Sequence, residues 1–139
     1  DNRTTAMTGA QTNPGLDEEG KRKIDIESVV KGIGVDYVKT VDPYNLKMST
    51  EAVKEALNTE GVSVVISKRE CALIVPKKKY TFVVDLEKCT GCMNCINEIA
   101  CPAMYVTEDH KVQIDEFLCD GCAVCVQTCP EKAIKVRKI

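Results

Sequence analysis

The sequence of 139 residues lacks tryptophan, has only two phenylalanines and four tyrosines, and contains a single histidine. With so few large side chains, a small domain can bury little apolar surface in its core, and bound metal is one way for it to gain stability. No apolar run is long enough to span a bilayer, so no membrane partner is expected. The 19 basic and 21 acidic residues are spread along the chain, so nucleic acid is not indicated as a partner either.

Signatures of hydrolytic and nucleotide-binding sites are also missing. The sequence has no Ser/His/Asp set and no glycine-rich phosphate loop. His110 lies between two short apolar runs, Met104–Val106 and Val112–Ile114, so we expect it at an exposed hairpin tip. Cys71 stands apart from the other cysteines, and we expect it to be a small buried residue and not a ligand.

Cysteine, by contrast, is abundant, and eight of the nine cysteines fall in two runs. The first run, C-T-G-C-M-N-C-I-N-E-I-A-C-P, contains Cys89, Cys92, Cys95 and Cys101. The second run, C-D-G-C-A-V-C-V-Q-T-C-P, contains Cys119, Cys122, Cys125 and Cys129. The second run has the C-x2-C-x2-C-x3-C-P spacing of bacterial iron–sulfur proteins, whereas the first has five residues before its last cysteine.

This spacing predicts two [4Fe-4S] clusters with crossed ligation. A C-x2-C-x2-C loop can turn three sulfurs toward one cluster but cannot wrap round to supply the fourth, which in two-cluster ferredoxins comes from the other run. One predicted ligand group, called here the first set, is Cys89, Cys92, Cys95 and Cys129. The other, the second set, is Cys119, Cys122, Cys125 and Cys101. In each loop a glycine, Gly91 or Gly121, lets the backbone take conformations closed to other residues.

Two other uses of the cysteines were weighed. A disulfide framework is disfavoured because no signal peptide is evident and adjacent triplets would compete for partners. Structural zinc sites usually show paired C-x2-C motifs with a long gap, not triplets. Reduced thiolate ligands point to the cytoplasm.

The segment from residue 24 to residue 67 has the periodicity of helix–strand–helix–strand. Apolar residues at helical spacing follow Asp25, which is predicted to cap a helix that ends at Gly32 or Gly34. They are Ile26, Val29, Val30 and Ile33. Residues 35–41 are predicted to form a short strand, followed by a turn at residues 42–45.

A second helix is predicted with Thr50 as its cap and with Val53, Ala56 and Leu57 on its buried face. The β-branched run Val62–Ser67 is typical of a strand covered on both faces in a parallel sheet. Two strands and two helices are too few to cover such a sheet, so this α/β segment is expected to be the closing part of a larger domain.

The remainder is predicted to be an α+β unit with an approximate internal repeat. Its first and last strands are expected at Tyr80–Asp85 and Ala133–Val136. Short helices are expected to follow the cysteine loops, at Asn94–Ala100 and Ala123–Thr128. From about Lys78 onward the chain resembles a bacterial-type two-cluster ferredoxin domain.

Residues 1–9, D-N-R-T-T-A-M-T-G, resemble the close of the thiamine-diphosphate motif of 2-oxoacid:ferredoxin oxidoreductases. The stretches K-I-D-I-E, V-D-P-Y-N-L and V-V-I-S-K-R-E-C-A-L resemble other parts of the same domain. Such a domain followed by a two-cluster ferredoxin domain resembles the large (alpha) subunit of indolepyruvate ferredoxin oxidoreductases. The domains implied are the C-terminal part of a thiamine-diphosphate-binding domain at 1–75 and the ferredoxin domain at 76–139.

The resemblance also implies a cofactor site at the start of the chain. The side-chain oxygen of Asn2 and the backbone carbonyl of Thr4 would ligate Mg²⁺, which takes oxygen ligands and bridges to cofactor phosphates. The residues that would line the loop around thiamine diphosphate are Thr5, Met7, Thr8 and Gly9. The Gly-Asp-Gly-like motif that opens this site is absent from the 139 residues, so thiamine diphosphate and magnesium are expected in the full-length enzyme only.

The function implied is oxidation of an indolepyruvate-type 2-oxoacid, with electrons passing through two [4Fe-4S] clusters to ferredoxin. The cofactor carries the chemistry of decarboxylation, so no catalytic side chain is expected here, and the chain alone is expected to be inactive. The implied partners are a smaller (beta) subunit, ferredoxin, coenzyme A and the 2-oxoacid. The alternative is a free-standing two-cluster electron carrier with a non-catalytic α/β extension.

Overall fold

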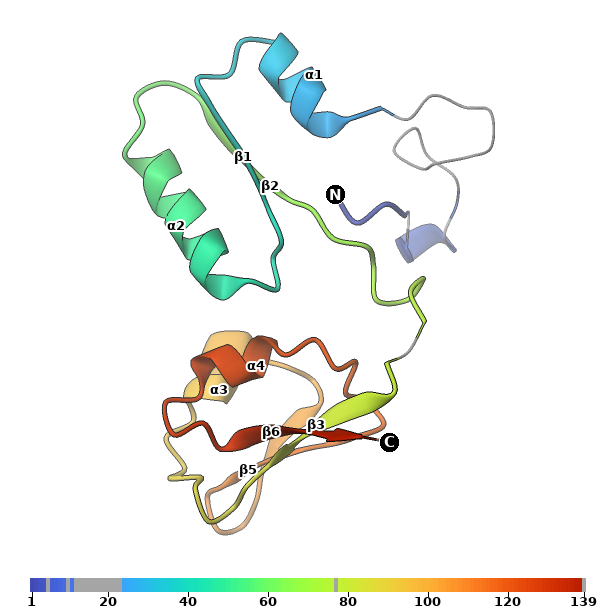
Figure 1. Ribbon diagram of the computed structural model, residues 1–139, viewed down its shortest axis with the longest axis vertical. Coiled ribbons are helices and arrows are strands. Elements are labelled where there is room, and N and C mark those ends of the chain that lie inside the picture. The colour runs from blue at the N-terminus through green and yellow to red at the C-terminus, as the bar shows by residue number, and fades with distance from the viewer. Residues whose placement is uncertain (5, 10, 12–23, 77, 139) are drawn as a thin grey trace. The chain divides into compact units, whose positions relative to one another are not determined.

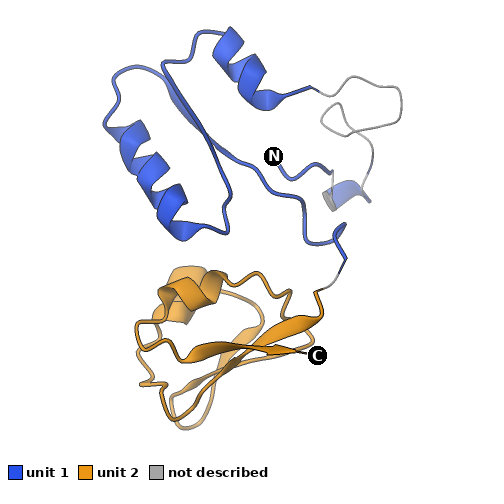
Figure 2. Cartoon of the chain, viewed as in Figure 1, with its two compact units in different colours: residues 1–76 blue, residues 77–139 orange. Residues whose placement is uncertain are grey.

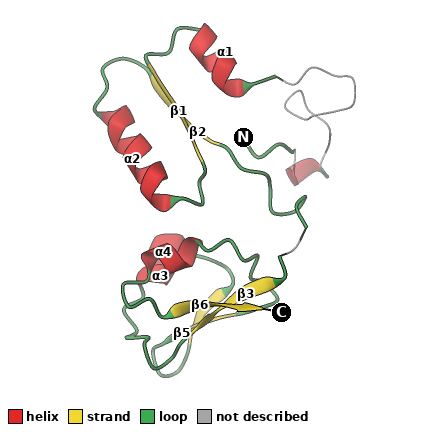
Figure 3. Ribbon diagram, in the orientation of Figure 1, coloured by secondary structure: helices red, strands yellow, loops and turns green. Residues whose placement is uncertain are grey.

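A computed structural model describes residues 1–4, 6–9, 11, 24–76 and 78–138 of the chain. The chain divides into two compact units, unit 1 at Asp1–Pro76 and unit 2 at Lys77–Ile139 (Figure 2). Both units contain helices and strands (Figure 3). Among the described residues, no helix combines the length and the apolar character needed to cross a membrane.

Unit 1 contains the helix–strand–helix–strand order that the sequence predicts (Figure 1). A short 3-10 helix, η1 at Ala6–Thr8, precedes the main elements. These are α1 at Ile26–Gly32, β1 at Tyr37–Val41, α2 at Leu46–Leu57 and β2 at Ser63–Ser67. Strands β1 and β2 run parallel, with Tyr37 opposite Ser63 and Val41 opposite Ser67.

The caps of the two helices differ in how well the sequence predicted them. Asp25 caps α1 as expected, since its carboxylate accepts a 3.0 Å hydrogen bond from the backbone N–H of Ser28. The prediction of Thr50 as the second cap was wrong. The cap of helix α2 lies five residues earlier, where the side chain of Asn45 accepts a 3.1 Å hydrogen bond from the N–H of Met48. Asn45 also ends the turn after β1, so one residue closes the turn and starts the helix.

The predicted buried face of α2 was also wrong. Val53 and Leu57 are exposed, and the helix buries Ala52 instead, the small side chain that lets it approach the strands. No described residue of α1 is buried. Strand β2 buries only Ile66, so the expected cover on both faces is not present within this unit.

Unit 2 consists of short strands and two short helices. Its elements are β3 at Tyr80–Val84, α3 at Asn94–Ile99, β4 at Met104–Val106, β5 at Val112–Ile114, α4 at Val124–Thr128 and β6 at Ile134–Lys138. Strand β3 pairs antiparallel with β6, and β4 with β5. All six elements fall where the sequence predicts them, within a few residues.

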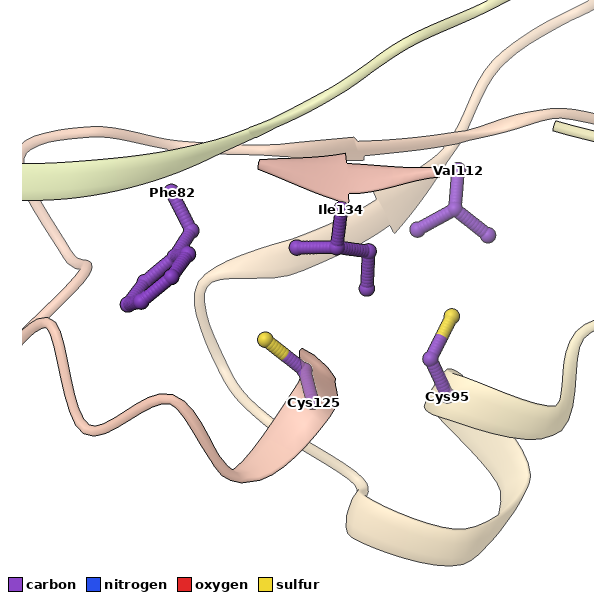
Figure 4. Packing of buried hydrophobic residues seen from close by; sticks show 5 residues of the cluster. All are labelled: Phe82, Cys95, Val112, Cys125 and Ile134. Carbon is purple, nitrogen blue, oxygen red and sulfur yellow. The ribbon is translucent and has the colours of Figure 1, made fainter. Parts of the chain in front are cut away.

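The core of unit 2 lies between the strands and the two helices. Phe82, Val112 and Ile134 project from β3, β5 and β6, and the thiols of Cys95 and Cys125 point toward them from the first turns of α3 and α4 (Figure 4). Five buried residues form this cluster, and two of them are cysteines. Residues that the sequence assigns to metal ligation therefore occupy the place where a larger domain would put aliphatic side chains.

Candidate metal centres

Both cysteine loops share a backbone conformation that aims their sulfurs inward. Gly91 and Gly121 have φ of 71° and 65°, as expected for the left-handed region that favours glycine. Met93 and Ala123, each following the second cysteine of its triplet, are also left-handed, with φ of 61° and 63°. Sequence reasoning missed these two, because a side chain in this region is uncommon and carries no sequence signal. The left-handed residue ends the loop, and the helix with the third cysteine in its first turn begins directly after it.

The four cysteines of the first set line one cavity. Cys89, Cys92 and Cys95 come from the first run, and Cys129 reaches the same cavity from the second run. Apolar residues complete the wall, among them Val84, Val112 and Ile134. Burial raises the pKa of the Cys95 thiol, and the neighbouring Cys129 and Cys92 raise it further. The same four sulfurs that the sequence groups together are thus brought together in the structure.

The second set is gathered around Cys125. Burial, and then the nearby Cys122, Cys119 and Cys101, raise the pKa of the Cys125 thiol to about 12. A thiol with a raised pKa keeps its proton at neutral pH until a metal replaces that proton, since metal coordination deprotonates a thiol. Cys101 takes part although five residues, and not three, separate it from Cys95.

A compensating change in loop length explains how Cys101 reaches its place. The two halves of unit 2 repeat with an offset of thirty residues, so that Cys89 corresponds to Cys119 and Gly91 to Gly121. Cys101 and Cys129 differ by only 28, but Ala103 and Ala133 are again thirty apart. Both alanines are buried, and their carbonyls accept hydrogen bonds from Asp115 and Asp85 respectively. The two residues added before Cys101 are therefore matched by two added after Cys129.

One sulfur already receives a backbone hydrogen bond. The N–H of Ala133 donates to Sγ of Cys129 at 3.3 Å. Hydrogen bonds to cluster sulfurs are one of the features that set reduction potential. Sequence reasoning missed this contact, because it depends on the turn that brings residue 133 back toward residue 129.

The thiols fit a multi-iron cluster better than a single ion. All nine cysteines are free of disulfides. In the described part of the chain, no three His, Cys, Asp or Glu side chains gather closely enough to hold one metal ion. A [4Fe-4S] cluster instead needs four thiolates standing apart around it, each on its own iron, and an apolar cavity with four cysteines in its wall suits that group.

Two other predicted positions can be compared with the structure. His110 is exposed at the tip of the β4–β5 hairpin, as expected, with a left-handed φ of 55°. Cys71 was expected to be buried but is only half-buried. Its N–H donates to the carbonyl of Asn2 at 3.0 Å, so it lies in the segment that runs beside the start of the chain.

The residues predicted to bind magnesium and thiamine diphosphate lie in an amino-terminal stretch of which residues 1–4, 6–9 and 11 are described. Oδ1 of Asn2, the predicted magnesium ligand, accepts a 3.3 Å hydrogen bond from the N–H of Thr4, which is buried. Thr8 and Gly9 are exposed, Met7 is fully exposed, and Thr5 lies outside the described residues. A magnesium–diphosphate group needs further oxygen ligands, and these residues therefore fit it only as one side of a larger site.

Comparison with known proteins finds a matching family for each half of the chain. Residues 81–130 match the 4Fe-4S dicluster domain family, and residues 1–67 match the C-terminal TPP binding domain of thiamine pyrophosphate enzymes. The chain is thus similar to a class of iron–sulfur protein in which part of a thiamine pyrophosphate enzyme domain precedes a domain for two [4Fe-4S] clusters. The predicted domain order and cofactors are confirmed at this level.

Within that class, the chain is homologous over nearly its whole length to the indolepyruvate oxidoreductase subunit IorA. The subunit from Methanothermobacter thermautotrophicus is 49% identical over 97% of this chain, and that from Pyrococcus horikoshii is 47% identical over 99%. The resemblance drawn from the sequence is thereby confirmed. The chain spans 22% and 23% of the length of these two relatives. The pyruvate synthase subunit PorD of Methanocaldococcus jannaschii is 42% identical over 40% of the chain and 66% of its own length.

Proposed function

We propose that this chain is the electron-transfer portion of a thiamine-dependent 2-oxoacid ferredoxin oxidoreductase that acts on indolepyruvate or related arylpyruvates. Support comes from the two domain matches in one chain and from relatives named as indolepyruvate oxidoreductase subunits. When bound, thiamine diphosphate supplies the decarboxylation and oxidation chemistry, and iron–sulfur clusters supply stepwise one-electron transfer. The further partners of this proposal are a smaller (beta) subunit, ferredoxin and coenzyme A, and its location is the cytoplasm.

The single observation that carries the electron-transfer role is the cavity shared by three cysteines of the first run and Cys129 of the second. It supports the crossed assignment in which the first set holds one cluster and the second set holds the other. The left-handed residues at the ends of the loops orient the sulfurs, and Phe82, Val112 and Ile134 keep water from the space between strands and helices. Excluding water protects thiolate ligation and lets the surrounding protein set the reduction potential.

The proposed division of labour follows the domains. Residues 1–75 would complete one side of an α/β thiamine-diphosphate-binding domain, and residues 76–139 would form an α+β bacterial-type two-[4Fe-4S] ferredoxin domain. Exposed apolar residues on α1 and α2, such as Val29, Val53 and Leu57, support the first assignment, because a complete domain would cover them.

The experiment begins with anaerobic reconstitution of the chain with iron and sulfide. About eight irons and eight sulfides per chain are expected, and the reduced protein should pass electrons to a viologen or to ferredoxin. Stoichiometric zinc without iron under the same conditions would exclude the cluster assignment. The parent protein, extended upstream of Asp1, should then reduce viologen with indolepyruvate and coenzyme A.

The free-standing electron carrier is the second candidate, favoured by the absence of a Gly-Asp-Gly-like thiamine-diphosphate motif from the 139 residues. The two candidates differ in one result. If the upstream-extended protein holds both clusters but shows no activity with any 2-oxoacid, the carrier is correct and the oxidoreductase is not.

A further inference from the structure

The second cysteine loop is bonded to the side chain of Lys78, and no such bond to the first loop occurs among the residues 78–138. Nζ of Lys78 donates a 2.8 Å hydrogen bond to the backbone carbonyl of Gly121, which lies between Cys119 and Cys122. The ammonium group also stands 5.4 Å from the centroid of the Tyr80 ring, within cation–π range. Lys78 is half-buried and Gly121 is buried, so water screens this charge less than it screens a surface lysine.

The internal repeat shows that this cation has no counterpart at the first loop. With the offset of thirty, Gly121 corresponds to Gly91 and Lys78 to Glu108. An exposed carboxylate therefore stands in the sequence position where the other half has an anchored ammonium. Glu131, the second residue after Cys129 of the first set, is exposed and belongs to the residues around this cavity, whose lined surface is apolar. The position that corresponds to Lys78 at the first loop therefore carries no cation.

Three other charges act in the opposite sense, but each is less well placed. Lys88 precedes Cys89 of the first loop, and its side chain is exposed, so solvent screens it. Asp120 lies in the second loop, and its side chain is exposed, so solvent screens it. Lys111 donates to the carbonyl of Leu86, which precedes the first loop and is not part of it. Among the lysines and arginines that the structure describes, Lys78 is the one that is both half-buried and bonded to the loop backbone between two cysteines.

We propose that Lys78 raises the reduction potential of the cluster held by the second set above that of the cluster held by the first set. The inference rests on the proposed cluster assignment. Each cluster gains one negative charge when it takes up one electron, and a nearby cation stabilises that reduced state. The second set would then hold the cluster on which the first electron rests, and electrons would run from the first set toward it.

Midpoint potentials in the reconstituted full chain test the proposal. Titration monitored by electron paramagnetic resonance should resolve two potentials. Lys78→Met and Lys78→Gln should both lower the higher potential and leave the lower one in place, whereas Lys78→Arg should keep both at their original values. Lys79→Met is the matched control, because it removes the same charge from the exposed neighbouring lysine and should shift neither potential.

Each contrary result has a distinct meaning. A Lys78→Gln variant that keeps the original potentials would show that a hydrogen-bond donor suffices, and the charge mechanism would be wrong. Loss of iron in both uncharged variants would show that Lys78 stabilises the loop structure instead, and this result would overturn the proposal. A shift in potential no larger than that in Lys79→Met would overturn it as well. In all these cases the unmodified chain still binds about eight irons. A lower iron content in the unmodified chain would instead overturn the proposed function itself.

Discussion

Gly91 and His110 meet backbone to backbone: a Cβ atom added to Gly91 would lie 2.4 Å from the carbonyl oxygen of His110. The first cysteine loop is thus pressed against the tip of the β4–β5 hairpin. Gly91→Ala should weaken cluster binding, because the methyl group must displace that tip and the left-handed backbone adds roughly 1–2 kcal/mol for a residue other than glycine. The rate at which a chelator removes iron from the reconstituted protein should rise.

Gly121→Ala is the matched comparison, since that glycine is also left-handed but its added Cβ would meet the carbonyl oxygen of Tyr80 at 3.1 Å. It should release iron more slowly than Gly91→Ala and faster than the unmodified protein. Equal release rates in the two variants would show that backbone conformation, and not the contact with His110, explains the requirement for glycine.

Pairs of cysteine variants can decide between crossed and sequential ligation. If Cys129 serves the first set, Cys129→Ser combined with Cys95→Ser damages one cluster, and about four irons should remain. Cys129→Ser combined with Cys125→Ser should damage both clusters and leave almost none. Sequential ligation predicts the reverse order of iron content. Metal analysis after anaerobic reconstitution gives the answer without any need to assign spectra.

The hydroxyl of Tyr37 donates a 2.6 Å hydrogen bond to the carboxylate of Glu55, which joins β1 to α2. This bond, with burial and the carboxylate charge, raises the pKa of Tyr37 from 10.0 to about 12. Because the folded pKa lies above the ordinary value, the contact stabilises unit 1 fully below pH 10, and this contribution is lost as the pH rises through 12. Absorbance at 295 nm of the iron-free chain should show a tyrosine component that appears near pH 12. Glu55→Gln should move that component to lower pH, and Tyr37→Phe should remove it.

The chain alone should neither bind thiamine diphosphate tightly nor oxidise a 2-oxoacid. Asn2 and Thr4 offer at most one side of the magnesium site, and magnesium relies on few protein ligands, so losing the aspartate of the opening motif removes a large share of them. Calorimetry with thiamine diphosphate and Mg²⁺ should give no tight binding, and a viologen assay with indolepyruvate no turnover. Either positive result would mean that these residues form a more complete site than proposed.

Local patterns predicted most of the elements, whereas contacts between elements escaped prediction. Neighbours in sequence were enough to predict the β4–β5 hairpin, the helix cap at Asp25 and the two cysteine loops. Thr50 was mistaken for a cap because Asn45, at the end of a turn, satisfies the helix start earlier. The hydrogen bond from Ala133 to Cys129 could not be predicted, because it depends on the turn between them, in which Lys132 has a left-handed φ of 50°.

The shared cavity of Cys89 and Cys129 also constrains the order of events during biosynthesis. Ile134 belongs to the same cavity wall and to β6, the strand that pairs with the first strand of unit 2. The cavity therefore cannot form during translation until residue 134 has been synthesised. Three of the four thiols are synthesised before the cavity can form, so we expect iron to bind only after the unit is complete.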